Sequence, residues 1–428
     1  MGDPNWIIAI KDKIENMPDF SQEIEQWKKR SIYKLPPRVI DLDSKSYKPQ
    51  IVSIGPYHHG EPHLKPMEDH KERALVHFIK RSSVPIEAYL EALNHVVQDL
   101  RDAYDALDPK WLNNAPDFLR LMILDGCFIL EVLRMGSSGL DAGYAPNDPV
   151  FSSHGLLYVL PFLRCDMLLL ENQVPLLVLV KLLQVEKKKF QVEPHDEYQM
   201  NRLIIRFFHP GPRNMRVGKC LHILDVCRKS LLNEPRTMRT HHAHGHQGGE
   251  VSGEIHSASE LSEAGIRFER SIIMSLRDIS FEGNTLRLPM LFINAETKLE
   301  LLNLIAFERF HTGAGNEVSS DPKDVSLLRS CGIIYNALGS DKDIIKLFKL
   351  LHTDIVVDPD SDLDIVYMQV SRKLSRRLRK RLHEWGSDFA RTYFRSPWAV
   401  VSIIAGVLLF TLAAIQTVYS VLGYYRPK

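Results

Sequence analysis

Cysteine is scarce in this chain and does not occur in the spacing of a redox or zinc motif. The chain of 428 residues has five cysteines, an odd number, and none forms a Cys-x-x-Cys pair. They lie mostly inside apolar runs, where cysteine behaves as a small buried hydrophobe. This pattern indicates a body that stays in a reducing compartment. The five are Cys127, Cys165, Cys220, Cys227 and Cys331.

Two features of secreted proteins are also missing. No Asn-x-Ser/Thr sequon occurs, and the N-terminal apolar run WIIAI meets a charged residue after five residues. Such a run is too short for the hydrophobic region of a signal peptide. Both absences predict that the folded body lies in the cytosol.

Familiar catalytic signatures are missing as well. The sequence contains no GxSxG elbow, no GxxxxGK[ST] loop, no GxGxxG and no HExxH. Each of these motifs places a nucleophile, a phosphate-binding backbone or a metal ligand at a defined spacing. Cys127 has no histidine at a diagnostic distance, so it is a weak candidate nucleophile. We predict that the protein is not an enzyme and holds no cofactor or metal.

The chain has almost no net charge, but the charge is unevenly distributed. The total is +1, while residues 372–395 hold nine Lys/Arg and two Asp/Glu, a local balance of +7. Arg426 and Lys428 add +2, so residues 1–371 carry −8. An acidic body argues against nucleic-acid binding, which requires a basic face. The basic segment instead indicates contact with the lipids of an anionic membrane leaflet.

A stretch of 25 residues without Asp, Glu, Lys or Arg runs from Trp398 to Leu422. As a helix it would be about 37 Å long, and a hydrocarbon core is about 30 Å thick. We predict a single transmembrane helix over 397–422, followed by a short tail at 423–428. Ser402 and Gly406 form a small-xxx-small pair, which favours a homo-oligomer through this helix. The predicted anchor residues are Trp398, Gly406, Phe410 and Leu422.

A basic helix is predicted at 372–395, next to this span. By the positive-inside rule its charge places the body on the cytoplasmic side. Its apolar stripe of Leu374, Leu378, Leu382 and Trp385 suits the headgroup region, with recognition by a calmodulin-like partner as the alternative. The residues predicted to contact the membrane surface are Arg372, Lys373, Arg376, Arg377, Arg379, Lys380 and Arg381.

Hydrophobic periodicity predicts a mainly α fold: a large helical body with Pro-rich extended segments, then the C-terminal helix. An N-terminal amphipathic helix is expected at 1–30 and the main helical domain at 31–371. The Pro-rich stretch Ser31–Gly60 lacks a helical period and is expected to be extended, with a short strand at Ile51–Ile54. Further strands or extended pieces are expected at Ile266–Ile279 and Leu286–Ile293. A helix is expected over the run VSLLRSCGIIYNALGS that begins at Val325.

Residues Leu156–Leu183 form a second long apolar run. Arg164, Asp166 and Glu171 lie inside it, and such charges cost about 2.5–3.5 kcal/mol each at a bilayer centre. We therefore expect two buried helices divided near Pro175 rather than a membrane span.

Histidines are the obvious candidates for metal binding. His241, His242, His244 and His246 lie in a Gly-rich linker at about 233–257, without a carboxylate or thiolate at ligand spacing. We expect adventitious binding of nickel or zinc there rather than a dedicated site. The pair His58–His59 follows a Gly-Pro-Tyr turn, and we expect it to bind backbone groups left free by the prolines.

Carboxylates inside apolar helices require partners. Asp125, Asp166 and Glu171 are the candidates for acid–base catalysis, since two of them facing one cleft would have raised pKa values. The alternative role is anchoring, by hydrogen bonds that fix helix packing or the Pro-rich segment.

Several motifs together resemble the plant membrane proteins grouped as domain-of-unknown-function family 247. They occur in family order over nearly the whole chain, although Leu35-Pro-Pro stands where Val-Pro is more usual. The matching stretches are IYKLPPRV from Ile32, YKPQIVSIGPYHHG from Tyr47, LKPMEDHK from Leu64, LDGCFILE from Leu124, DMLLLENQVPLLVL from Asp166, LSEAGIRF from Leu261, LLNLIAFE from Leu301, SCGIIYNALGSD from Ser330, and YFRSPWAVVSIIAG with QTVYSV near the C-terminus.

The resemblance implies a helical, plant-specific protein with one C-terminal transmembrane helix and no defined catalytic residues. Some members are implicated in self-recognition between pollen and stigma in grasses. We therefore expect a non-enzymatic, tail-anchored recognition or signalling component at the plasma membrane, acting through protein–protein contacts with an unidentified partner. The alternative hypothesis is a membrane-anchored enzyme that uses Asp125, Asp166 and Glu171.

Overall fold

The chain divides into two units in a computed structural model. The first comprises Met1–Ser259 and Arg267–Ser361, and the second Glu260–Ile266 and Asp362–Lys428. The residues that the structure describes are 5–15, 17, 19–138, 143–187, 194–209, 216–232, 257–271, 275–311, 322–352, 366, 368–376, 380 and 397–425.

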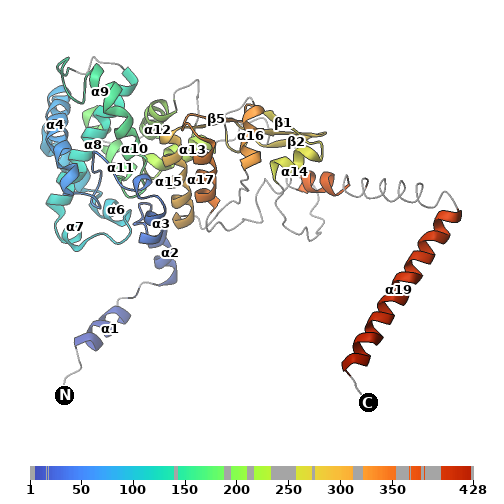
Figure 1. Cartoon of the computed structure of the whole chain (residues 1–428). Helices are drawn as coiled ribbons and strands as arrows, with labels where there is room; N and C mark the ends of the chain where they lie inside the picture. Colours follow the sequence, from blue (N-terminus) through green and yellow to red (C-terminus); the bar gives the residue numbers. More distant parts are fainter. Residues whose placement is uncertain are drawn as a thin grey trace. The chain divides into compact units, whose positions relative to one another are not determined.

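Helices dominate the described residues, as the periodicity predicts (Figure 1). Those up to residue 232 are α1 (Asn5–Glu15), α2 (Phe20–Lys29), α3 (Pro37–Leu42), η1 (Ser44–Ser46), η2 (Pro62–Met67), α4 (Glu68–Ser82), α5 (Ile86–Asn94), α6 (Val97–Asp102), α7 (Pro109–Asn113), α8 (Ala115–Ser138), α9 (Ser153–Tyr158), α10 (Leu160–Asp166), α11 (Leu176–Glu186), α12 (Pro194–Phe208) and α13 (Ile223–Leu231). Those after residue 256 are α14 (Ala258–Glu263), α15 (Ala295–His311), α16 (Pro322–Ser330), α17 (Asp341–His352) and α19 (Pro397–Tyr425).

The N-terminal region is not the single helix expected over 1–30. It forms two helices, α1 and α2. Asp19 starts the second helix, because its carboxylate accepts from the N–H of Gln22 and the Gln22 side chain accepts from the N–H of Asp19. This reciprocal capping box defines a new helix start where the sequence periodicity continues.

Helix α8 is the centre of the helical body and packs against α4, α5, α11 and α12 (Figure 1). Every residue from Leu121 to Leu133 is buried, which is typical of a helix in the middle of a large core. Gly126 allows α11 to approach closely, since a Cβ there would lie 2.5 Å from Leu182 Cδ1 and 2.9 Å from Val178 Cγ1. A larger residue at this position would require the side chains of Leu182 and Val178 to move.

The expected division of the apolar run Leu156–Leu183 near Pro175 is confirmed, but the expectation of two buried helices is wrong, since Leu157, Tyr158 and Phe162 are exposed. Pro175 is the N-cap residue of α11, where the missing N–H of proline is tolerated. The part before Pro175 contains α9 and α10, followed by a turn.

Two small sheets complete the first unit. β3 (Thr285–Leu288) is the middle strand of three, parallel to β1 (Arg267–Arg270) and antiparallel to β2 (Ser280–Glu282). The second sheet pairs β4 (Leu291–Ile293) in parallel with β5 (Ile334–Asn336).

Two expectations about secondary structure are wrong, one for a helix and one for a strand. The predicted helix from Val325 ends with α16 at Ser330, because Gly332 has a φ of +67° and the following residues pair with β4 as β5. Conversely, Ile51–Ile54 is extended but forms no strand within the described chain. Its backbone groups bond to side chains instead, as described below.

The C-terminal helix α19 covers Pro397–Tyr425, so the predicted helix is present. In the part of the chain described above, no helix is sufficiently long and apolar to cross a membrane, so the predicted transmembrane role is not shown. Most of the predicted basic helix at 372–395 and of the His-rich linker at about 233–257 lies outside the described residues.

His222 holds the start of the Pro-rich segment against the body. Its ring is fully buried; Nε2 lies 3.0 Å from the carbonyl oxygen of Ser31, and Nδ1 accepts from the N–H of Asp225 at 3.3 Å. A neutral ring protonated on Nε2 satisfies both contacts, whereas a second proton on Nδ1 would face the Asp225 N–H. Burial lowers the pKa of His222 to about 4.

Stability should therefore fall as the pH drops from about 6.5 toward 4. In that window the unfolded chain binds a proton at His222 and the folded chain does not, because an unperturbed histidine has a pKa of about 6.5. Linkage predicts a loss of about 2 kcal/mol between pH 7 and pH 5 from this group. Urea unfolding of the wild type and of His222→Asn, which does not titrate, measures this loss as the difference between their pH profiles.

The matched control is His95→Asn, at an exposed histidine that ends α5. It should retain the wild-type pH profile. Parallel profiles for the wild type and His222→Asn would show that His222 does not carry the pH dependence.

Candidate functional site

Contrary to the expectation, the Pro-rich stretch Ser31–Gly60 is not extended throughout, because α3 and η1 lie inside it. Its part after η1 is held by side chains of the helical body rather than by a neighbouring strand. Asp166, at the end of α10, accepts from the N–H groups of Gln50, Ile51 and Val52 at 2.9, 2.8 and 3.0 Å. Burial raises the pKa of Asp166, and the N–H groups of this stretch oppose that rise. The carboxylate replaces the acceptors that a strand would supply.

Asn172 continues this pairing in both directions. Its Oδ1 accepts from the N–H of Ile54 at 2.7 Å, and its Nδ2 donates to the carbonyl of Val52 at 3.1 Å and to that of Asp166 at 2.9 Å. The amide is fully buried and all of these partners are main-chain groups. The side-chain amide of Asn172 therefore supplies both the acceptor and the donor that a residue of a neighbouring strand would supply.

Asp125, on α8, forms the next anchor together with Lys71, on α4. Lys71 Nζ lies 2.7 Å from Asp125 Oδ1, and the N–H of Gly55 donates to Oδ2 at 2.8 Å. Both charged side chains are fully buried, and Glu68 and Ser53 give the ammonium two further acceptors at 2.8 and 3.2 Å. Burial raises the pKa of Asp125, while Lys71 and the Gly55 N–H oppose the rise.

Gly55 is required at this anchor. Its φ is +75°, and a Cβ there would lie 2.4 Å from the carbonyl oxygen of Gln173. Only glycine combines this left-handed conformation with such close backbone contact.

Glu171 is the third anchor and contacts two parts of the stretch. It accepts from the N–H of Leu35, and its Oε2 lies 3.3 Å from Nε2 of His58. The distance between Glu171 Oε2 and His58 Nε2 is that of an ion pair. The contact lacks hydrogen-bond geometry, and Nε2 has no hydrogen-bond partner among the described residues. Burial lowers the pKa of His58, but Glu171 and Glu61 outweigh it, so the net shift is upward.

The expectation for His58–His59 is therefore wrong in its partners. His58 pairs with carboxylates, including Glu61 at 2.7 Å from Nδ1, and not with proline-exposed backbone. His59 lies edge-on to the ring of Trp111 with the centroids 5.5 Å apart. The two rings bind to different neighbours.

The three predicted carboxylates thus serve as anchors. Asp125 and Asp166 are 0% exposed and Glu171 is 5% exposed, and each accepts a main-chain N–H of the Pro-rich stretch. Their other contacts are also with the chain itself: Lys71 at Asp125 and His58 at Glu171. Burial also raises the pKa of the Cys127 thiol, which disfavours the thiolate form needed for nucleophilic attack.

A fourth buried carboxylate, Glu131 on α8, is held by two arginines. Arg81 Nη1 donates to it at 2.9 Å from α4, and Arg134 Nη1 donates at 2.9 Å from the next turn of α8. Tyr144 adds a hydroxyl at 3.0 Å. This cluster fixes α4 against α8, and the sequence signal for it was an acidic residue inside an otherwise apolar helix.

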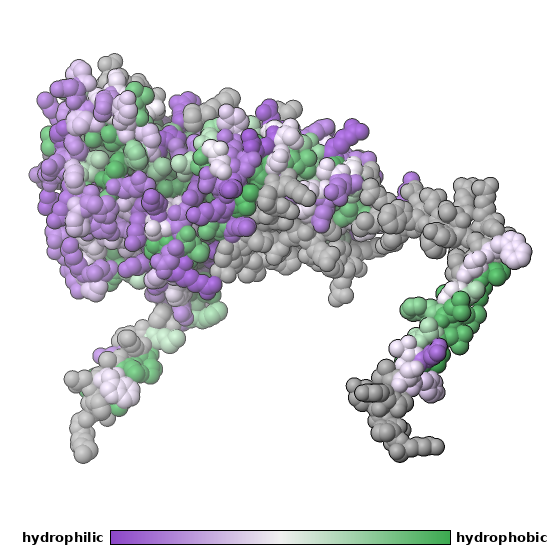
Figure 2. All heavy atoms as spheres, in the orientation of Figure 1, coloured by the Kyte–Doolittle hydropathy of each residue, from purple (hydrophilic) through white to green (hydrophobic). Residues whose placement is uncertain are grey.

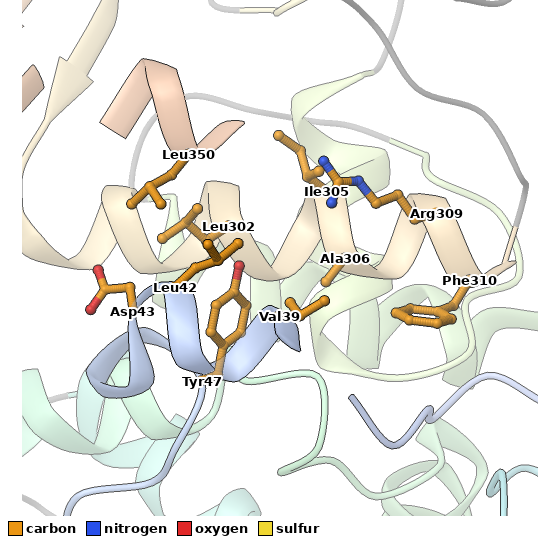
Figure 3. Close-up of a pocket in the computed structure, with 10 residues that line it drawn as sticks. All are labelled: Val39, Leu42, Asp43, Tyr47, Leu302, Ile305, Ala306, Arg309, Phe310 and Leu350. Carbon is orange, nitrogen blue, oxygen red and sulfur yellow. The ribbon is translucent and has the colours of Figure 1, made fainter. Parts of the chain in front are cut away.

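A small cavity lies between α3, the two residues that flank η1, α15 and α17 (Figure 3). Tyr47 extends along it, Asp43 and Arg309 lie toward opposite ends, and most of the remaining wall is aliphatic. Burial raises the pKa of the Tyr47 phenol to about 12, so it is protonated at neutral pH. The volume is about 50 Å³, whereas pockets for cofactors and other small ligands are roughly 300–1,000 Å³. The cavity therefore does not fit a small-molecule substrate.

One group of metal-ligating side chains occurs among the described residues. It consists of His209, Cys227 and Glu300, whose candidate ligand atoms all lie within 4.8 Å of one another. The sequence did not indicate it, because the three residues are far apart along the chain. The predicted His-rich segment, by contrast, lies outside the described residues.

The predicted membrane-contacting residues are only partly described. Arg372, Arg376 and Lys380 are exposed and Lys373 is half-buried, while Arg377, Arg379 and Arg381 lie outside the described residues. Leu374, predicted to lie in the headgroup region, is buried in the folded chain.

The predicted anchor residues lie on α19. Trp398 and Phe410 are highly exposed, and a Cβ on Gly406 would meet no atom within 4 Å. The side chain of Leu422 lies outside the described part of the helix.

The fold and the anchors define a class of protein: a mainly helical body in which buried carboxylates and a buried amide hold a Pro-rich N-terminal stretch. The chain belongs to the family DUF247, described as a plant protein of unknown function, whose model matches residues 32–412.

Two relatives come from Arabidopsis thaliana. The UPF0481 protein At3g47200 is 30% identical over 437 residues, covering 93% of this chain and 87% of the relative. The putative UPF0481 protein At3g02645 is 20% identical over 517 residues, covering 96% and 93%. No solved structure matches the chain.

The substitution Asp166→Asn should destabilise the fold by about 3 kcal/mol. An amide has one acceptor oxygen, so at least one of the three N–H groups from Gln50, Ile51 and Val52 would lose its partner and face an N–H₂ group. Urea unfolding measures the change. Asp41→Asn, at an exposed position on α3, is the matched control and should stay within about 0.5 kcal/mol of the wild type. Equal effects of the two substitutions would refute the anchoring role.

The substitution Lys71→Met should cost about 3–5 kcal/mol, because it leaves the buried Asp125 without its counter-charge. The double variant Lys71→Met/Asp125→Asn should recover part of this loss, since a neutral amide can still accept from the N–H of Gly55. Lys80→Met, at an exposed position of the same helix, is the control. Additive losses in a double-mutant cycle would mean that Lys71 and Asp125 do not depend on each other.

Proposed function

We propose that this protein is a non-enzymatic recognition component attached to the plasma membrane, acting through contacts of its cytosolic body with a protein partner. In this proposal α19 crosses the bilayer once and the basic segment before it contacts the anionic cytoplasmic leaflet. The observation that carries the proposal is the apolar surface of α19.

The described side chains of α19 leave a large apolar area uncovered. In Figure 2 this helix is coloured hydrophobic over most of its described length. Besides Trp398, ten of its large hydrophobic side chains are more than half exposed: Val401, Ile404, Val407, Leu408, Leu409, Phe410, Leu412, Ile415, Val418 and Tyr419. Removing one such side chain from water is worth about 1.5–3 kcal/mol, so ten of them strongly favour an apolar surrounding.

The flanks of α19 agree with a lipid surrounding. Trp398, near its start, is 80% exposed and has the amphipathic ring typical of the membrane interface. Arg372, Arg376 and Lys380 are exposed, and a basic residue near an anionic leaflet contributes about 1 kcal/mol.

A second copy of α19 is the proposed partner within the membrane. The face around Gly406 is open, so another helix can approach its backbone closely. The neighbouring Ser402 hydroxyl donates to the carbonyl of Trp398 at 2.8 Å, which satisfies it within its own helix. Both small residues are therefore compatible with a helix–helix contact in an apolar medium.

Support for a recognition role comes from the use of the buried charges. Asp125, Asp166 and Glu171 are engaged by the Pro-rich stretch, and the cavity of about 50 Å³ is too small for a substrate. Because these hydrogen bonds hold the Pro-rich stretch against the helices, the body is suited to present a surface of fixed shape to a protein partner.

The full-length chain should sediment with membranes after carbonate extraction. The double substitution Leu409→Arg/Phe410→Arg places two charges near the middle of α19, each costing about 2.5–3.5 kcal/mol at a bilayer centre. It should move the protein into the soluble fraction. In sealed microsomes a tag after Lys428 should be protected from protease while the body is digested.

The matched control is Leu157→Arg/Tyr158→Arg, at two exposed residues of α9 that are 70% and 64% exposed. This variant should remain with the membranes. Membrane association that survives the α19 substitution would contradict the proposal, and digestion of the Lys428 tag would reverse its orientation.

A further inference from the structure

Three helices bring a histidine, a cysteine and a glutamate together in the body. His209 directly follows α12, Cys227 lies on α13 and Glu300 lies on α15. One candidate ligand atom from each lies within 4.8 Å of the other two, and His209 Nε2 is 3.1 Å from Glu300 Oε1. Cys227 is fully buried, and the side chains of His209 and Glu300 are 13% and 8% exposed.

The elements that carry these residues are fixed to one another. Arg164 donates from Nη2 to the carbonyl of Phe208 at 3.0 Å and to Glu296 Oε1 at 2.6 Å. It thereby joins the end of α12 to the first turn of α15. The N–H of His209 donates to the carbonyl of Ile205 at 2.8 Å, which holds the histidine at the helix end. The three side chains are thus positioned by the fold before any ligand binds.

The contacts within the chain leave part of the cluster unsatisfied. His209 Nδ1 is buried and has no hydrogen-bond partner among the described residues. The contact of His209 with Glu300 uses only the Nε2 nitrogen of the ring, and it does not involve the buried thiol of Cys227. A metal ion would use a donor from all three residues.

We propose that His209, Cys227 and Glu300 bind a zinc ion. Imidazole nitrogen, thiolate sulfur and carboxylate oxygen are the three donor types that zinc binds in proteins, at about 2.0–2.3 Å. The three donor atoms, which lie within 4.8 Å of one another, have to move closer together to bind one ion. With three protein ligands, the fourth tetrahedral position is left for a water molecule or a partner group.

Charge balance favours a divalent ion at this position. A thiolate and a carboxylate together carry two negative charges, which neutralise Zn²⁺ with a neutral imidazole as the third ligand. The nearby Arg164 is already paired with Glu296. Binding requires the Cys227 thiol to lose its proton, so the proton is released to solvent as the Zn–S bond forms.

The ion would connect α12, α13 and α15 in the same region as the supports of the Pro-rich stretch. His222, which caps α13, holds Ser31, and Asn303 on α15 donates to the carbonyl of Ser46 at 2.8 Å. Zinc binding is therefore expected to raise the melting temperature of the body.

Cobalt titration of the metal-free, full-length chain tests the site, because tetrahedral Co²⁺ reports a thiolate ligand by a charge-transfer band. We expect one cobalt per chain with this band, and its displacement by one equivalent of zinc. Cys227→Ser should abolish the band, and His209→Gln or Glu300→Gln should weaken cobalt binding at least tenfold.

Two controls separate this site from other donors. Cys165→Ser removes a half-buried cysteine outside the cluster and should retain the band. Replacement of His241, His242, His244 and His246 by glutamine removes the His-rich segment and should also retain it. If Cys227→Ser does not fold, as judged by circular dichroism, the comparison of Glu300→Gln with the controls decides. A band that survives Cys227→Ser, a cobalt affinity that is unchanged in Glu300→Gln, or the absence of the band from the wild type at saturating cobalt would overturn the proposal.

Discussion

Buried main-chain N–H groups of an extended segment are the constraint on which this fold depends. A stretch without a strand partner cannot be buried unless something else accepts its hydrogen bonds. Asp125 on α8, Asp166 at the end of α10, and Glu171 and Asn172 in the turn before α11 supply those acceptors. The acidic groups are therefore part of the architecture of the body.

The same constraint explains why charged groups occur in the centre of the core. A carboxylate that accepts several N–H bonds is compensated for part of its lost hydration, and Lys71 compensates Asp125 directly. Removing one member of such a set leaves the others buried and unpaired. We infer that the helical core and the Pro-rich stretch form as one cooperative structure.

Sequence patterns predicted the parts of the fold that depend on local physics. The helical class, the break at Pro175 and the anchoring alternative for Asp125, Asp166 and Glu171 follow from periodicity, proline geometry and the cost of burying charge. Residues that act across large separations were not predictable. In the sequence, Lys71 is one of several charged residues of an amphipathic helix. Its side chain is completely buried because α8 packs over it, and the sequence of its own helix does not show this.

Two errors have the same origin. Hydrophobic periodicity does not report the capping box at Asp19, where α2 begins. It also does not report that the residues after Gly332 pair with β4 and form the strand β5. The cluster of His209, Cys227 and Glu300 was missed because no short motif joins three residues on separate helices. Spacing along the chain identifies metal sites only when the ligands lie on one or two neighbouring elements.

The anchoring of the Pro-rich stretch has a consequence for biosynthesis. The acceptors in Asp166 and Glu171 lie 116 and 136 residues after the N–H groups of Gln50 and Leu35 that they bind, and Asn303 lies 257 residues after Ser46. At a translation rate of about 5–20 residues per second, the stretch leaves the ribosome on the order of ten seconds before its partners. During that interval its apolar residues have no native surface to cover them. The nascent chain therefore presents an extended, proline-rich segment to chaperones before its own helices can bind it.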